Sequence, residues 1–122
     1  MSSVGKYIGL LMASRTQAHV FHLTTKSYAA HKALQNYYEG IVPLLDSYAE
    51  TYMGRANKPS LSGLGPSVNK RVLTDAKYAH KYFIKLAIVL KKMKLPKNQY
   101  LENIRQEIDA LVRQTIYMLS LK

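Results

Sequence analysis

Apolar residues recur at alternating steps of three and four along most of this chain of 122 residues. Three runs with this spacing cover residues 31–52, 72–93 and 101–118. Such steps place side chains on one face of a helix, whereas a half-buried strand needs strict alternation, which none of the runs has. A fourth stretch, residues 4–22, keeps the helical spacing less regularly. The sequence therefore predicts four amphipathic helices and no sheet.

Turn-forming residues divide this pattern at few places. We expect helices at residues 3–23, 27–54, 67–95 and 97–121, a loop at 55–66 rich in Gly, Pro and Ser, and Ser67 as the N-cap of the third helix. Residues 24–27 predict a tight turn, with one long helix as the alternative, and Pro43 predicts a kink. The expected fold is all-α: one domain over residues 1–122, an antiparallel four-helix bundle.

Charge is the strongest pointer to a partner. The net charge is +11, from 18 Lys and Arg against 7 Asp and Glu, which favours nucleic acid or another polyanion. Five lysines form a band on one side of the predicted helix 67–95: Lys70, Lys77, Lys81, Lys85 and Lys92. A solvated lysine face and an acidic protein partner are the alternatives. Ile84 and Ile88 fall in the same band, which suggests contact with another subunit or a partner.

Composition excludes several kinds of chemistry. The chain has no Cys, which removes disulfides, thiolate metal sites and Cys nucleophiles. No apolar run approaches the roughly 20 residues of a membrane span. The stretch 7–13 continues into a helical pattern, so we interpret it as helix and not as a secretory signal. No Gly-rich phosphate loop or nucleophile motif is present, and no catalytic residue is predicted.

Two histidines and two carboxylates stand at a suggestive spacing. His22-Leu23 is followed by His31, and Asp46-Ser-Tyr-Ala-Glu50 lies 15 residues beyond His31. This arrangement resembles the ferritin-like superfamily and, within it, the Dps proteins, most closely a small Dps-like family of bacteriophage genomes. The resemblance implies a ferritin-like bundle and an inter-subunit iron site formed by His22, His31, Asp46 and Glu50. Two departures are Leu23, where the family has an aromatic residue, and Gln35, where it has a further acid.

Helix geometry requires such a site to lie between chains. His31 and Asp46 are about 22 Å apart along one helix, at 1.5 Å per residue, so one ion cannot bridge them within a chain. Two copies of helix 27–54, antiparallel about a two-fold axis near Gly40, would bring the histidine of one to the carboxylates of the other. The missing side chain of Gly40 would allow close approach.

These observations predict a phage-encoded, Dps-like homo-oligomer that binds nucleic acid without sequence preference, in the host cytoplasm or in the virion. A ferroxidase with inter-subunit sites is the first alternative. A metal-free structural or host-factor-binding protein that kept the fold is the second.

Overall fold

The computed structural model describes residues 4–55 and 61–121, and the part of the chain that it describes is helical without strands. The helical segments are α1 (Val4–Thr24), α2 (Tyr28–Arg55), α3 (Leu64–Val68), the 3-10 turn η1 (Ala76–Tyr78), α4 (Ala79–Lys92) and α5 (Gln99–Leu119). The expected all-α class is therefore confirmed. No helix in these ranges is both long enough and apolar enough to cross a membrane.

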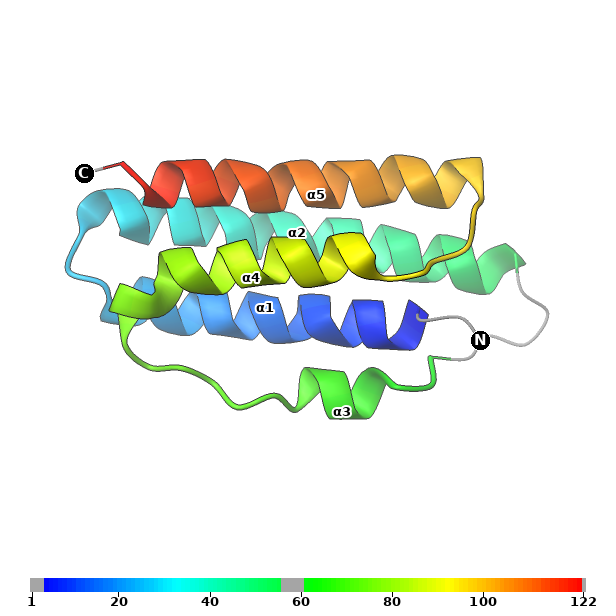
Figure 1. The fold of residues 1–122 in the computed structure, drawn as a ribbon, viewed down its shortest axis with the longest axis horizontal. Coiled ribbons are helices and arrows are strands. Elements are labelled where there is room, and N and C mark those ends of the chain that lie inside the picture. The colour runs from blue at the N-terminus through cyan, green and yellow to red at the C-terminus, as the bar shows by residue number, and fades with distance from the viewer. Residues whose placement is uncertain (1–3, 56–60, 122) are drawn as a thin grey trace.

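The four long helices form a bundle in which neighbours along its sides are antiparallel (Figure 1). Helix α2 packs against α1 and α5, and α4 packs against α5 and, less extensively, against α1. Helices α2 and α4 run in the same direction and lie across the bundle from each other, and they meet in the core, where the Tyr37 and Phe83 rings pack edge to face with centroids 4.7 Å apart. The chain therefore has to return along the whole bundle between them. Residues 61–75, including α3, make this return beside α1.

The prediction of one helix over residues 67–95 is wrong in its first half. Ser67 lies inside the short α3 and is not an N-cap, and residues 70–75 have no regular structure. Helical structure resumes only at Ala76, after Asp75, whose side chain accepts a hydrogen bond from the Lys77 backbone N–H. The physical reason is the crossover. A helix rises only 1.5 Å per residue. If those residues were helical, the connection would be too short for the chain to return along the bundle.

The other breaks follow local sequence. Helix α1 ends at Thr24 and α2 begins at Tyr28, so residues 25–27 form the break expected there. The Ser27 hydroxyl accepts a hydrogen bond from the Ala30 backbone N–H, as an N-cap does. Helix α2 continues through Pro43 as one element. At α5, the Asn98 side chain caps the first turn, two residues after Pro96.

Two devices hold the crossover against α1. Gly5 and Gly9 lie one turn apart, and a Cβ on either would collide with crossover backbone: with Leu61 and Ser62 at Gly5, and with the Leu64 carbonyl, at 2.6 Å, at Gly9. Further along, the buried Gln17 amide donates to the Leu73 carbonyl and accepts from the Leu73 N–H, both at 2.7 Å. A glycine groove and a bidentate amide thus attach the crossover at both ends.

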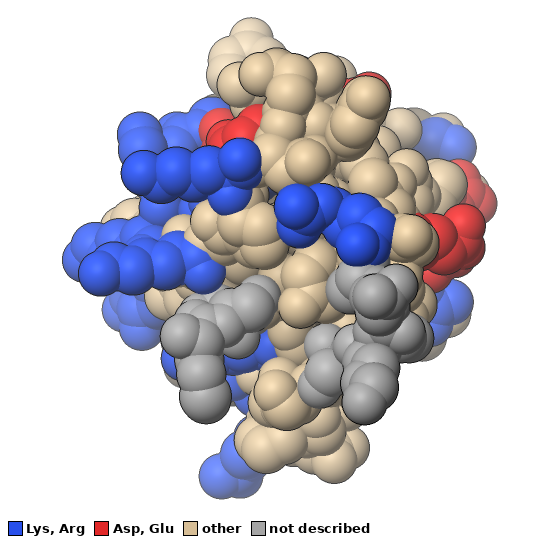
Figure 2. Space-filling model, turned by 90° about the vertical axis from the view of Figure 1, so that its right-hand side faces the viewer, with Lys and Arg blue, Asp and Glu red and all other residues tan. Residues whose placement is uncertain are grey.

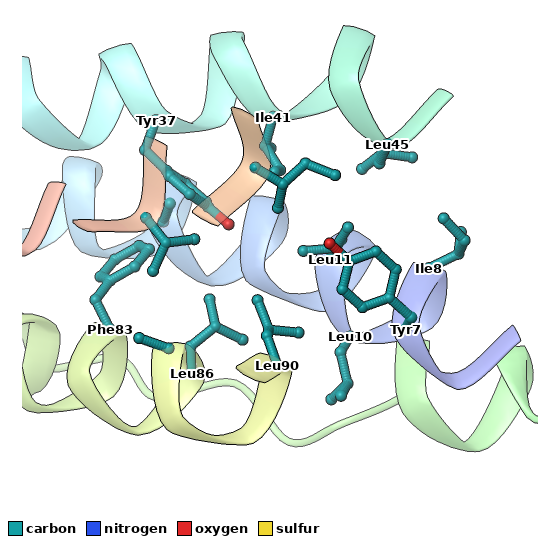
Figure 3. Close-up of a cluster of buried hydrophobic side chains, with 14 of the residues drawn as sticks. Tyr7, Ile8, Leu10, Leu11, Tyr37, Ile41, Leu45, Phe83, Leu86 and Leu90 are labelled. Carbon is teal, nitrogen blue, oxygen red and sulfur yellow. The ribbon is translucent and has the colours of Figure 1, made fainter. Parts of the chain in front are cut away.

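The core is apolar and rich in tyrosine. Leu11, Phe83 and Ile41 are fully buried, and side chains from α1, α2 and α4 converge in Figure 3. Tyr37 is also fully buried and its hydroxyl is 2.7 Å from the Ser14 hydroxyl, which in turn donates to the Leu11 carbonyl. These side chains link α1, α2 and α4 into one hydrophobic core.

Candidate nucleic-acid interface and the predicted metal residues

Helix α4 separates its two faces by polarity. Its inner face buries Ala79, Phe83, Leu86 and Leu90 against the bundle. Its outer face, together with η1, exposes lysines one or two turns apart along the axis: Lys77, Lys81, Lys85 and Lys92. Figure 2, a view from one end of the bundle, shows the largest group of Lys and Arg on one side, with Asp and Glu more prominent on the other. The predicted band of lysines is thus a solvent-facing surface.

Little negative charge balances this surface. Lys77 pairs with Asp75 at 3.8 Å, and both side chains are more than half exposed, which makes the pair a weak one. The only other ion pair among the described residues joins Arg113 to Asp109, at 2.8 Å. Lys81 and Lys85 therefore stand one turn apart as like charges with no carboxylate beside them. An anionic ligand would relieve that repulsion.

Lys70 reaches this region from a different element than the one predicted. It lies on the irregular crossover segment, next to Arg71, and not on a helix. Both residues nevertheless line a surface hollow together with Tyr82 of α4. The crossover therefore places two cations near Tyr82 of α4. The prediction that Lys70 lies on the same helical face as the other four lysines is wrong.

The tyrosines divide between the core and the surface, and the exposed ones are Tyr28, Tyr78, Tyr100 and Tyr117. Tyr37 and Tyr48 are fully buried, and burial raises the pKa of Tyr48 to about 12 and that of Tyr37 further. Burial likewise raises the pKa of Tyr7 and Tyr82. The fully buried rings of Tyr7, Tyr37 and Tyr48 cannot stack on nucleic-acid bases without unfolding the bundle, whereas Tyr82 is only partly buried.

The two predicted histidine ligands meet across the turn between α1 and α2. His22 Nδ1 lies 2.8 Å from the His31 carbonyl oxygen, and His31 Nδ1 lies 3.0 Å from the His22 carbonyl oxygen. The rings are stacked, with centroids 3.7 Å apart and planes 22° from parallel. Each Nδ1 therefore carries a proton that it donates, and the pair links the last turn of α1 to the first turn of α2.

This arrangement does not fit one shared metal ion. An ion lies in the plane of each imidazole that binds it, about 2.0–2.1 Å from the nitrogen, and two nearly parallel stacked rings have no such common point. Asp46 and Glu50 are exposed, further along α2. No group of three or more potential ligands comes together among the described residues. Within one chain, the structure brings together His22 and His31 and leaves the two carboxylates apart from them.

The histidine pair makes a testable contribution to stability. We expect His31→Ala to lower the free energy of unfolding by about 1–2 kcal/mol, because it removes a ring–carbonyl hydrogen bond and a ring stack. Urea denaturation of the metal-free protein measures this loss. His80→Ala is the matched control, since the ring of His80 is half-buried and makes no hydrogen bond among the described residues. Equal losses in the two variants would contradict a structural role for the pair.

Gly40 serves a contact inside the chain. A Cβ built on it would lie 3.2 Å from a methyl carbon of Leu111 in α5. Its missing side chain therefore lets α5 approach α2, and the direction of that approach is not the outer face of α2. The missing side chain of Gly40 is therefore no support for a two-fold axis at that point, and pairing of α2 with a second α2 stays a prediction.

One structural side chain was not predicted from the sequence. Arg105 on α5 donates to the carbonyls at the end of α4, reaching Leu90 at 2.8 Å, Met93 at 2.9 Å and Lys91 at 3.3 Å. It satisfies the carbonyl groups that a helix leaves open at its C-terminus. Its position in the sequence could have indicated this role, because Arg105 directly follows the inward-facing Ile104 in the apolar run of 101–118.

Comparison with known proteins finds a family of unknown function and a relative in a bacteriophage. Residues 22–119 match the model of a family of unknown function, DUF5856. The chain is also 27% identical, over 121 residues, to the uncharacterized 14.6 kDa protein in the mobD-ri intergenic region of Enterobacteria phage T4. That alignment covers 99% of this chain and 91% of the phage protein. No solved structure matches the chain significantly.

Proposed function

The chain belongs to DUF5856, a family of unknown function, and from its surface charge we propose that it binds nucleic acid without sequence preference through the outer face of α4. The observation that carries the proposal is the row of exposed lysines along η1 and α4. The one acidic residue beside this row is Asp75, which directly precedes η1 and pairs with Lys77.

The dimensions of this row suit a phosphate backbone. From Lys77 to Lys92 it extends about 22 Å, at 1.5 Å per residue. That length corresponds to the phosphates of about six base pairs, at 3.4 Å per pair. Contacts of lysine with phosphate position a protein without reading bases, and Lys70 and Arg71 on the crossover extend the cationic surface beyond the helix.

The kinship with ferritin-like and Dps-like proteins is part of the proposal. Ferritin-like bundles have one long crossover connection, and the described chain makes one such connection, between α2 and α4. The phage T4 relative supports a phage-encoded protein, and we place its action in the host cytoplasm or the virion. In this proposal the protein acts as a homo-oligomer, which would multiply the lysine rows presented to one nucleic acid.

Salt dependence tests the proposal. Fluorescence anisotropy with a labelled 20-base-pair duplex, from 50 to 200 mM salt, should show binding that weakens steeply. The variant Lys77→Gln/Lys81→Gln/Lys85→Gln should bind at least about tenfold more weakly, and the slope of log K against log salt should flatten by about 2–3, because each lost phosphate contact removes about 0.9.

A matched control separates this interface from general positive charge. Lys6→Gln/Lys26→Gln/Lys32→Gln removes the same charge from exposed residues of α1, the turn and α2. This variant should retain nearly the affinity and slope of the unmodified protein. Equal weakening by both triple variants, or a flat salt dependence, would overturn the proposal.

An inter-subunit iron site remains the alternative function. It is favoured by the way both Nδ1 atoms of His22 and His31 are held by backbone carbonyls, which is typical of metal-binding histidines. It would need one ring to leave the stack and the Asp46 and Glu50 carboxylates of a second copy. Native mass spectrometry after anaerobic Fe(II) loading tests it. Retained iron that is lost in Asp46→Ala would support the site, and protein without iron would reject it.

A further inference from the structure

A shallow apolar groove runs between α4 and α5 on the basic side of the bundle. Ile84, Ala87, Ile88 and Ile116 line it, with Lys91, Lys92 and Arg113 beside them. Ile84 is 39% and Ile88 50% exposed, which is unusual for a pair of isoleucines one turn apart. Exposed apolar side chains bordered by charge are typical of a contact surface.

A complementary surface exists on the same chain. Between Lys32 and Arg55, helix α2 carries only acidic charge, and its outer face exposes Glu39, Asp46 and Glu50 with no ion pair among the described residues. Val42, 37% exposed, lies one turn from Glu39 and one turn from Asp46. This acidic ridge, defined by Glu39, Val42, Asp46 and Glu50, thus combines an apolar contact with carboxylates at helical spacing.

We propose that the acidic ridge on α2 of one copy docks into the α4–α5 groove of the next copy. Val42 contacts Ile84 and Ile88, and the carboxylates face Lys91 and Lys92. Helices α2 and α4 lie across the bundle from each other and meet through core side chains, so their outer faces point apart and one copy can engage two neighbours. The contact is head-to-tail, which produces a ring or a filament and not a two-fold dimer.

Charge favours this contact over pairing of α2 with a second α2. An antiparallel α2–α2 contact centred near residue 40 would bring the Glu39 side chains of both copies together at the crossing point. The groove instead offers lysines without ion pairs to the same ridge. Like-charge contacts disfavour a wrong partner, and complementary charges select the right register.

Charge reversal in two variants tests the contact. The ridge variant is Asp46→Lys/Glu50→Lys and the groove variant is Lys91→Glu/Lys92→Glu; all four side chains are exposed, so both variants should fold. Sedimentation velocity at tens of micromolar should show assemblies for the unmodified protein and mainly monomer for each variant alone, with association weakened at least about tenfold. An equimolar mixture should reassemble, because the basic ridge of one variant meets the acidic groove of the other.

The control is Lys6→Glu/Lys26→Glu, which makes the same change in net charge as the groove variant at exposed positions outside both surfaces and should assemble normally. A monomeric unmodified protein, or dissociation of only one of the two variants, would overturn the head-to-tail contact. So would a mixture that stays monomeric. The ridge variant separates this contact from nucleic-acid binding, because it keeps every lysine of the α4 row and should bind the duplex at least as well as the unmodified protein. The groove variant cannot do so, since Lys92 belongs to both surfaces.

Discussion

Gly9→Val should lower the free energy of unfolding by about 3 kcal/mol and the melting temperature by about 10 °C or more. A Cβ at Gly9 would lie 2.6 Å from both the Leu64 carbonyl oxygen and the Ser67 Cβ. Because the Leu64 oxygen is a backbone atom, it cannot rotate away as the end of a flexible side chain would. The crossover therefore has to move away from α1, and the neighbouring core residue Ile8 loses packing. Circular dichroism during heating measures the loss.

Gly54 supplies the matched control for this prediction. It also lies in a helix, but a Cβ built on it meets nothing within 4 Å. Gly54→Ala should therefore leave stability unchanged or raise it by up to about 1 kcal/mol, since alanine favours the helix. If Gly9→Val melted within about 2 °C of the unmodified protein, the close packing of the crossover on α1 would be refuted.

Arg105→Met should cost about 2–3 kcal/mol of unfolding free energy, because charged hydrogen bonds to three carbonyls at the end of α4 are lost together. Methionine keeps the length and apolar stem of the side chain, so the loss isolates the guanidinium. Arg105→Lys should recover less than half of it, since one ammonium cannot reproduce the planar fork. Urea denaturation monitored by circular dichroism measures each value.

Arg113 is the control on the same helix. Its guanidinium pairs with Asp109 one turn away, and both side chains are about half exposed. Arg113→Met should cost at most about 0.5 kcal/mol, as exposed pairs at this spacing do. Equal costs at positions 105 and 113 would show that Arg105 acts through surface charge and not by capping α4.

The spacing of apolar residues predicted the helices correctly where the conformation depends only on residues close together in the chain. Residues 28–55 and 99–119 fold as the apolar steps indicate, and the hydroxyl side chain of Ser27 marks a helix start. The same spacing misled at Val72, which continues the apolar run but lies in the crossover, 36% exposed. A heptad pattern reports which residues could share a face and does not report whether the backbone must extend to reach another part of the bundle.

The candidate site shows the same difference between features that local sequence predicts and features that packing decides. The lysines at 77, 81, 85 and 92 are exposed as their projection predicts, because the opposite face of α4 is apolar enough to be buried. The sequence grouped His22 and His31 together as candidate ligands. Their ring stack and their hydrogen bonds to backbone carbonyls depend on how α1 and α2 meet at residues 25–27. Which atoms face each other across a turn is decided by packing and is invisible in spacing.

The sequence by itself determined the helical class, the positive face of α4 and the break after Thr24, since each follows from periodicity, charge and capping within a few neighbouring residues. Only the tertiary structure decided that α2 and α4 run parallel, that Gly5 and Gly9 accommodate a crossover and that Gly40 faces Leu111. It also decided that Arg105 caps a helix other than its own. These features join residues far apart in the chain, and the free energy that selects them comes from side chains and backbone brought together only when the whole bundle closes.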